Sequence, residues 1–139
     1  MQQRLQTPYA VYGTLRSGMG NDGIWRGLAE VVDAGVVRGF RLVSNGSFPY
    51  ALPAGVDSEI VVEVLQPDQG YEETVRHNLD CLEGYPSFYD RILVDVENDR
   101  GNATCWLYTP ADPERYEGLE PVDNNDWRTH VVAGQRVSA

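Results

Sequence analysis

Short apolar runs separated by Gly and Pro dominate this chain and predict a fold made mostly of strands. Runs of this length that are rich in β-branched and aromatic residues are typical of strands. We expect six of them: Tyr9–Thr14, Val31–Val37, Gly39–Val43, Ile60–Leu65, Ile92–Glu97 and Ala103–Thr109. The last two flank Asn98–Asn102, where Asn, Asp and Gly favour a hairpin turn.

One segment, Tyr71–Leu82, has the periodicity of a long helix. Three apolar residues recur at i, i+4 and i+7 and share one face: Val75, Leu79 and Leu82. Glu72 and Glu73 lie in the first turn, where acidic side chains stabilise a helix, and Gly84 follows as a stop. His77 points away from the apolar face, so we expect it in solvent.

The remaining segments are less regular. Asn21–Gly27 predicts a short helical turn, and Ser44–Gly55, with two Pro and two Gly, predicts an irregular loop lying over another part of the molecule. Because no repeat or linker interrupts the chain, we expect residues 1–139 to form a single domain. Residues 1–8 are then a frayed lead-in, and residues 110–139 a C-terminal extension.

The composition is that of a globular protein, with 42% hydrophobic residues. No apolar stretch approaches the roughly 20 residues needed to cross a bilayer. Residues 1–8 are polar and lack the apolar core of a signal peptide, so we expect an unprocessed, cytoplasmic protein.

The net charge argues against polyanionic partners. The chain has 21 acidic and 11 basic residues, a formal charge of −10, and no basic run. Such a surface repels phosphate backbones and anionic membranes, so we expect neither nucleic acid nor a membrane as a partner. Two histidines are too few for a histidine-rich metal site, and no spaced carboxylate motif calls for magnesium, although a carboxylate-only site stays open.

The two cysteines, Cys81 and Cys105, have neither C-x-x-C spacing nor neighbouring metal ligands. We expect both to be buried thiols rather than a disulfide or a nucleophile.

The first candidate for chemistry is the run Tyr12, Gly13, Thr14 and Leu15, which follows the first strand. A glycine turn can direct backbone amides at a small anion or a carbonyl oxygen. The same run is also typical of a strand that turns tightly into a loop. The run indicates a functional site only in combination with a second block of sequence.

That block contains Glu83, which follows Leu79 by four residues at the end of the predicted helix. Its charge would lie at the negative end of the helix dipole, where Lys or Arg would be stabilising. Residues that break local rules are often functional, and partial burial there would raise the pKa of a carboxyl group. The residues alone leave two structural roles open, a hydrogen bond with a loop amide and an ion pair with Arg91.

Two blocks, YGTL at residues 12–15 and LDCLEGYPSFYDR at residues 79–91, carry a resemblance to a known family, with VVEV at residues 61–64 as a matching strand between them. In this order and spacing the chain resembles the γ-glutamylcyclotransferase-like family, particularly its short γ-glutamylamine cyclotransferase branch. The resemblance runs from about residue 9 to residue 109, with a looser match at residues 126–128.

The resemblance implies an α+β fold. It is a compact, mostly antiparallel β-barrel with one main helix and short helical turns, a cavity at one end of the barrel and no cofactor. Glu83 is implied as the catalytic acid/base. The implied substrate-binding residues are Tyr12, Gly13, Thr14, Leu15 and Tyr89. This chain has Asn124 and Asn125 where relatives often have Gly before Asp-Trp, which puts the contribution of the C-terminal loop in question.

The implied reaction suits these residue types. In a γ-glutamyl amine or γ-glutamyl amino acid, the α-amine can close on the γ-carbonyl to give 5-oxoproline and a free amine. Holding the two groups together is the first requirement, and Glu83 would move protons between the amines. Amides of the Gly13 turn would bind the oxyanion or the α-carboxylate. The expected partner is therefore a small γ-glutamyl substrate, and the oligomeric state is not readable.

Other functions stay open. A non-catalytic small-ligand or protein-interaction module would keep the same fold and turn, although the presence of Glu83 favours an enzyme. A hydrolase or acyltransferase with Cys81 as nucleophile is disfavoured, because we expect no histidine near enough to activate the thiol.

We expect ordinary structural roles for several remaining polar and aromatic residues. We expect Arg16 and Arg91 in surface ion pairs, with a substrate carboxylate as the alternative partner, and Asp80 as a solubility charge on the outer side of the helix. The three tryptophans are expected in the core or a pocket wall: Trp25, Trp106 and Trp127.

Overall fold

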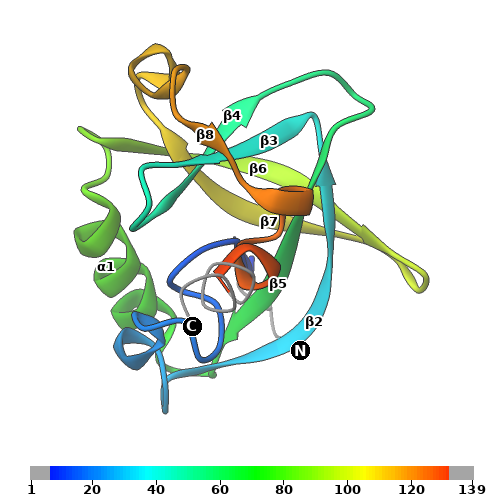
Figure 1. Ribbon diagram of the computed structural model, residues 1–139. Helices are drawn as coiled ribbons and strands as arrows, with labels where there is room; N and C mark the ends of the chain where they lie inside the picture. Colours follow the sequence, from blue (N-terminus) through cyan, green and yellow to red (C-terminus); the bar gives the residue numbers. More distant parts are fainter. Residues whose placement is uncertain (1–6, 132–139) are drawn as a thin grey trace.

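Five strands close into a barrel in the computed structural model of this chain, which describes residues 7–131 (Figure 1). Around the barrel the order is β1, β5, β2, β6, β7. Their bounds are β1 (Tyr9–Val11), β2 (Ala29–Arg38), β5 (Glu59–Pro67), β6 (Tyr89–Asn98) and β7 (Gly101–Pro110). Every neighbouring pair is antiparallel except β1 with β7, which confirms the mostly antiparallel barrel.

A three-stranded sheet lies beside the barrel, in the order β4, β3, β8. It consists of β3 (Phe40–Ser44), β4 (Pro49–Pro53) and β8 (Glu120–Pro121). The prediction of an irregular loop over Ser44–Gly55 is therefore wrong for β4. Proline is tolerated there because β4 is an edge strand, and Ala51 and Leu52 are buried. The prolines signalled an edge rather than a loop.

The long helix α1 (Glu72–Glu83) forms as predicted. It ends at Gly84, whose φ of 69° is the left-handed conformation that glycine adopts most easily. Val75 and Leu79 are buried and His77 is exposed, as expected. Leu82 differs, because 42% of it is exposed and it lines a cavity instead of the core.

Residues 7–131 also contain three 3₁₀ turns: η1 (Asp22–Ile24), η2 (Pro113–Tyr116) and η3 (Asp123–Asn125). The first matches the predicted turn at residues 21–27. Residues 127–131 are helical.

The buried apolar residues form two clusters. One fills the barrel and includes Val37, Ile60, Val62, Val96, Leu107 and Trp127. The other lies between α1 and the barrel and includes Tyr9, Trp25, Leu65, Val75 and Leu79, with Trp106 packed against it. The expectation for the tryptophans is confirmed. Cys105 is buried as predicted, but Cys81 is exposed, because its side of α1 does not face the core.

The chain ends lie partly outside the described residues. The predicted frayed lead-in falls mostly on residues 1–6, and the C-terminal extension includes residues 132–139, none of which the structure describes. The carbonyl of Pro8 accepts a hydrogen bond from the Trp106 amide, which ties residue 8 to the barrel. Within residues 7–131, no helix combines the length and apolarity that a membrane crossing requires.

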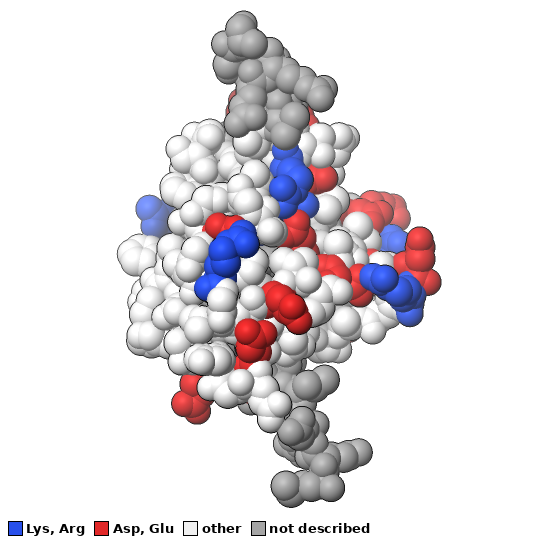
Figure 2. Space-filling model, turned by 90° about the horizontal axis from the view of Figure 1, so that it is seen from below, with Lys and Arg blue, Asp and Glu red and all other residues white. Residues whose placement is uncertain are grey.

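Charged side chains of both signs are interspersed on the surface. On the face shown in Figure 2, the arginines lie among Asp and Glu side chains and form no continuous basic patch. Elsewhere in the described residues, oppositely charged side chains pair directly, as Arg26 does with Asp22 and Arg100 with Asp33.

Candidate active site

A cavity of about 620 Å³ opens between the C-terminal end of α1, the turn after β1 and the start of β4. All six site residues predicted from the sequence line it: Tyr12, Gly13, Thr14, Leu15, Glu83 and Tyr89. The structure thus brings together two blocks that lie about seventy residues apart in the sequence.

The turn after β1 lines the cavity with residues 12–15. The carbonyls of Gly13 and Thr14 accept hydrogen bonds from the amides of Arg16 and Asn21, at 3.0 and 2.8 Å. Within residues 7–131, the amides of Gly13, Thr14 and Leu15 donate no hydrogen bond themselves. These donors are available to a ligand.

Gly13 is required by close packing. A Cβ at this position would lie 2.6 Å from Cγ of Pro49, well inside van der Waals contact. The ring of Pro49 occupies the space that a side chain at this position would need.

Four charged side chains hold the turn on its inner side: Arg16, Glu63, Asp126 and Arg128, here called the ion-pair cluster. Arg16 is 6% exposed, with Nε 3.3 Å from Glu63 Oε2 and Nη1 2.7 Å from Asp126 Oδ1. Arg128 Nη2 donates to Glu63 and to the Ser17 carbonyl, and the Ser17 amide donates to Glu63. Arg16 therefore forms ion pairs, as expected, but not at the surface, because Arg16 and Glu63 are buried and Asp126 is partly buried.

Glu83 is half-buried and lines the cavity. Among the described residues, it makes neither a hydrogen bond nor an ion pair, so neither structural role considered for it is observed. Arg91, one of those expected partners, lies with Nε 3.3 Å from Asp80 Oδ1.

The Arg91–Asp80 pair is itself partly buried. The guanidinium lies over the rings of Tyr85 and Trp106, 4.5 and 4.7 Å from their centroids, and Tyr108 donates a hydrogen bond to Asp80. Asp80 is thus not a solubility charge. Arg91 does form an ion pair, as expected, but the pair is partly buried rather than on the surface. Its burial was not predicted, because only the fold brings Trp106 and Tyr108 of β7 against this pair.

Burial raises the pKa of Glu83 from 4.5 to about 7. Burial first, and then the nearby Glu83, raise the pKa of Tyr12. Burial, Tyr12 and then Glu83 do the same for Tyr89. Near neutral pH, Glu83 therefore exchanges its proton easily while both phenols keep theirs.

The two tyrosines form the wall beside Glu83. Tyr12 donates a hydrogen bond of 2.7 Å to the Tyr108 carbonyl, which fixes its ring. Tyr89 lies near Tyr50, with ring centroids 6.4 Å apart.

A histidine does lie near Cys81, contrary to expectation. His77 precedes it by one helical turn, and its Nε2 lies 3.6 Å from the Cys81 sulfur. The spacing i, i+4 on a helix puts the two side chains on one face, a signal that the sequence carried.

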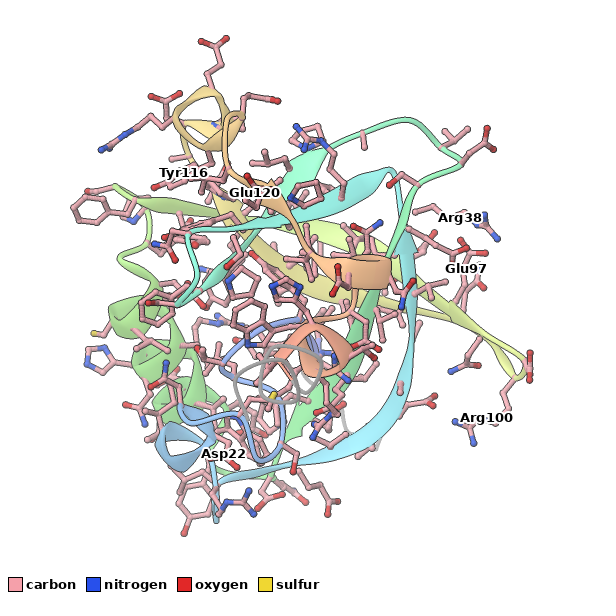
Figure 3. The ribbon with its side chains drawn as sticks, viewed as in Figure 1. Asp22, Arg38, Glu97, Arg100, Tyr116 and Glu120 are labelled. Atoms are coloured by element: carbon pink, nitrogen blue, oxygen red, sulfur yellow. The ribbon has the colours of Figure 1, made fainter. Side chains whose placement is uncertain are left out.

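Sequence reasoning missed several residues that line the cavity: Asn21, Phe48, Pro49, Tyr50, Phe88, Tyr108 and Tyr116. Asn21 donates to the Thr14 hydroxyl at 2.7 Å and shapes the turn. Tyr116 comes from η2 and lies beside β4 and β8 (Figure 3). No local pattern marks these residues, because they come from separate strands, loops and 3₁₀ turns.

The C-terminal segment supports the site through contacts outside the cavity. Asn124 and Asn125 have φ values of 58° and 50°, a region where Gly is easiest and Asn is tolerated. Asn125 accepts a hydrogen bond from the Leu42 amide and donates to the Glu59 carbonyl. Asp126 and Arg128 belong to the ion-pair cluster and do not line the cavity.

Among residues 7–131, no three side chains of His, Cys, Asp or Glu gather closely enough to hold a metal ion. The groups that line the cavity include the carboxyl group of Glu83, the Cys81 thiol, the Thr14 hydroxyl, the amides of the turn and several aromatic rings.

Comparison with known proteins gives a consistent result. Residues 9–129 match the family model described as gamma-glutamyl cyclotransferase, AIG2-like. A Methanocaldococcus jannaschii protein, provisionally named a gamma-glutamylcyclotransferase, is 32% identical over 99 residues, which cover 70% of this chain and 79% of that protein.

Two solved structures are also similar. A mouse AIG2-like protein has a TM-score of 0.68 and 26% identity, covering 85% of this chain and 86% of its own. An uncharacterized Pyrococcus horikoshii protein has a TM-score of 0.68 and 19% identity, covering 94% of this chain and 98% of its own, and shares the fold.

Proposed function

This chain belongs to the γ-glutamyl cyclotransferase, AIG2-like family, and we propose that it converts a γ-glutamyl amine or γ-glutamyl amino acid to 5-oxoproline and a free amine, without a cofactor. One observation carries the proposal. Glu83, a carboxyl group with a pKa of about 7 and no partner among residues 7–131, shares a cavity with the free amides of residues 13–15.

The turn would position the substrate. Its amides suit the α-carboxylate or the oxyanion that forms at the γ-carbonyl. The Thr14 hydroxyl accepts a hydrogen bond from Asn21, so its own proton remains available to the substrate. Fixing the α-amine against the γ-carbonyl supplies the entropic part of the rate enhancement.

Glu83 would move the protons. The ionised carboxylate takes a proton from the α-ammonium group, and the freed nitrogen attacks the γ-carbonyl carbon. As the bond to the leaving nitrogen breaks, protonated Glu83 returns the proton to that nitrogen. The α-nitrogen loses two protons overall and the leaving amine gains two, one after the other, and no water is consumed. A carboxyl group with a pKa of about 7 suits both directions of transfer.

The decisive experiment measures 5-oxoproline release from a panel of γ-glutamyl amines and γ-glutamyl amino acids. Glu83→Gln should lower kcat by about 10²- to 10⁴-fold while the protein stays folded. Glu73→Gln, the same change at an exposed position of α1, is the matched control and should keep the wild-type rate. A folded Glu83→Gln protein that cyclises as fast as wild type contradicts the assignment.

The Cys81–His77 distance supports a second candidate, acyl transfer through the Cys81 thiol. That mechanism predicts a large loss for Cys81→Ser, whereas the cyclisation mechanism predicts a rate within a few-fold of wild type. If no substrate reacts but the panel still binds, the chain is a binding module on this fold.

A further inference from the structure

The cavity is also lined by side chains to which the proposed chemistry gives no role in proton transfer. Besides the turn and Glu83, five aromatic residues line it, of which Tyr89 also lies beside Glu83: Phe48, Tyr50, Phe88, Tyr89 and Tyr116. These rings come from the approach to β4, β4 itself, the loop after α1, the start of β6, and η2. Segments distant in the sequence thus converge on one apolar wall.

Part of this wall is fixed in place. The rings of Tyr50 and Tyr116 stack with centroids 4.2 Å apart and planes 21° apart, and Tyr50 also faces Tyr89. Stacked rings of this kind form a flat, rigid surface against which another planar or apolar group packs well.

The remainder is left open to water. Phe48 is 46% exposed and Phe88 is 66% exposed, although both line the cavity. The free energy falls when a ligand removes large apolar side chains from water. Such residues at the mouth of a cavity are typical of a ligand-binding site.

The charges around the cavity define what the wall does not bind. Glu83 is the one charged residue among the lining residues that the structure describes. The nearby cations are engaged elsewhere, Arg91 with Asp80 and Arg16 with Glu63. A carboxylate on the leaving group would therefore enter the cavity without a countercharge, which is costly.

We propose that the aromatic wall is the subsite for the leaving amine, and that it takes an arylalkyl amine without a carboxylate, with Phe48 and Tyr116 as specificity-determining residues. This inference rests on the proposed function, because it assumes that the glutamyl half of the substrate occupies the turn beside Glu83.

Three matched substrates test it: γ-glutamyl-phenethylamide, γ-glutamyl-phenylalanine, which adds one carboxylate, and γ-glutamyl-methylamide, which lacks the ring. We expect kcat/KM for the phenethylamide to exceed that for the methylamide by about 10- to 100-fold, the usual gain for burying an aromatic ring. The kcat/KM for the phenethylamide should also exceed the kcat/KM for γ-glutamyl-phenylalanine by at least about tenfold. A ratio near one, or a preference for the carboxylate, overturns the proposal.

Substitutions locate the subsite. Phe48→Ala and Tyr116→Ala should each lower the phenethylamide-to-methylamide ratio severalfold. Tyr71→Ala, at an aromatic residue of similar exposure to Phe48 but outside the cavity, should leave the ratio unchanged. An unchanged ratio in both cavity variants overturns the assignment of these residues.

Binding separates this proposal from the proposed function. Calorimetry of the three substrates with Glu83→Gln needs no turnover, and the phenethylamide should bind about tenfold or more tightly than the methylamide. If wild type releases no 5-oxoproline but this difference in binding persists, the cyclisation mechanism fails and the aromatic subsite stands. Equal binding of both amides refutes the subsite even if cyclisation occurs.

Discussion

The ion-pair cluster and the cavity share one turn, residues 12–17, yet the carboxyl groups in them have opposite surroundings. Glu63 faces Arg16 and Arg128 and accepts a hydrogen bond from the Ser17 amide. Glu83 has none of these among the described residues. A buried carboxylate with such partners holds structure together, whereas one without them is free to exchange protons.

The pKa shifts of two carboxyl groups express this difference. Burial raises the pKa of Asp126, but hydrogen bonds from Arg16 and Thr129 and the charge of Arg16 outweigh it, so the pKa is lowered overall. For Glu83 nothing opposes burial, and its pKa rises to about 7. The desolvation of a carboxylate is thus offset by its partners in the ion-pair cluster, whereas nothing offsets it for Glu83 in the cavity.

Removing a cation from the cluster should have the largest effect on stability. Arg16→Ala leaves Glu63 and Asp126 without their shared partner, and breaking a buried pair in this way costs about 3–5 kcal/mol. Urea unfolding at pH 7 measures the loss.

The control for this prediction is Arg38→Ala. Its pair with Glu97 is exposed and lies on the opposite side of the barrel from α1 (Figure 3). Its unfolding midpoint should barely move. Similar losses in both variants would show that the cluster contributes no more than a surface pair.

Disturbing the cavity side of the turn should have an intermediate effect. In Gly13→Ala the new methyl group would lie 2.6 Å from Cγ of Pro49, and overpacking of this kind costs about 1–3 kcal/mol. The rate of cyclisation should fall by more than the loss of stability explains, because the amides of the turn must shift. Gly55→Ala, where no atom lies within 4 Å of the added Cβ, should affect neither property. A Gly13→Ala protein as active as wild type contradicts the assigned role of the turn.

The smallest expected effect is on the pH dependence of stability. The pKa of Glu83 is higher in the folded state than in the unfolded chain, so the folded state retains a proton that the unfolded state has lost between about pH 4.5 and pH 7. Stability should therefore fall as pH rises through this range, by about 1–3 kcal/mol.

Glu83→Gln should remove that fall, so that the variant exceeds wild type in stability at pH 8 and matches it more closely at pH 4. Unfolding curves of the two proteins between pH 4 and pH 8 measure the difference. Asp126, whose pKa is lowered, should act with the opposite sign, and its stabilising contribution should be lost as pH falls below about 4. Parallel curves for wild type and Glu83→Gln would mean that the carboxyl group is not desolvated.

Local patterns predicted the elements well where local physics decides them. The helix at residues 72–83 follows from its apolar spacing and its terminal glycine, and the β6–β7 hairpin follows from the Asn- and Gly-rich turn. The prediction for Pro49–Pro53 failed because proline suits an edge strand as well as a loop, and only the pairing with β3 distinguishes them.

The candidate site was predictable only in part. Glu83 and residues 12–15 were predicted as candidates because each breaks or marks a local pattern and the two blocks resemble a family, and they line one cavity. Phe48 and Tyr116 could not be found, since an aromatic residue in a loop has no local sign of the cavity it will line.

The sequence by itself determined the barrel strands, the long helix and the two blocks that meet at the cavity, because hydrophobic periodicity and turn chemistry act between near neighbours. The tertiary structure decided how each charge is used. Arg16 is buried and pairs with Glu63 and Asp126, and Arg91 pairs with Asp80. Glu83 has no partner among the described residues. Burial and pairing depend on which distant segments meet, and only the closed barrel brings those segments together.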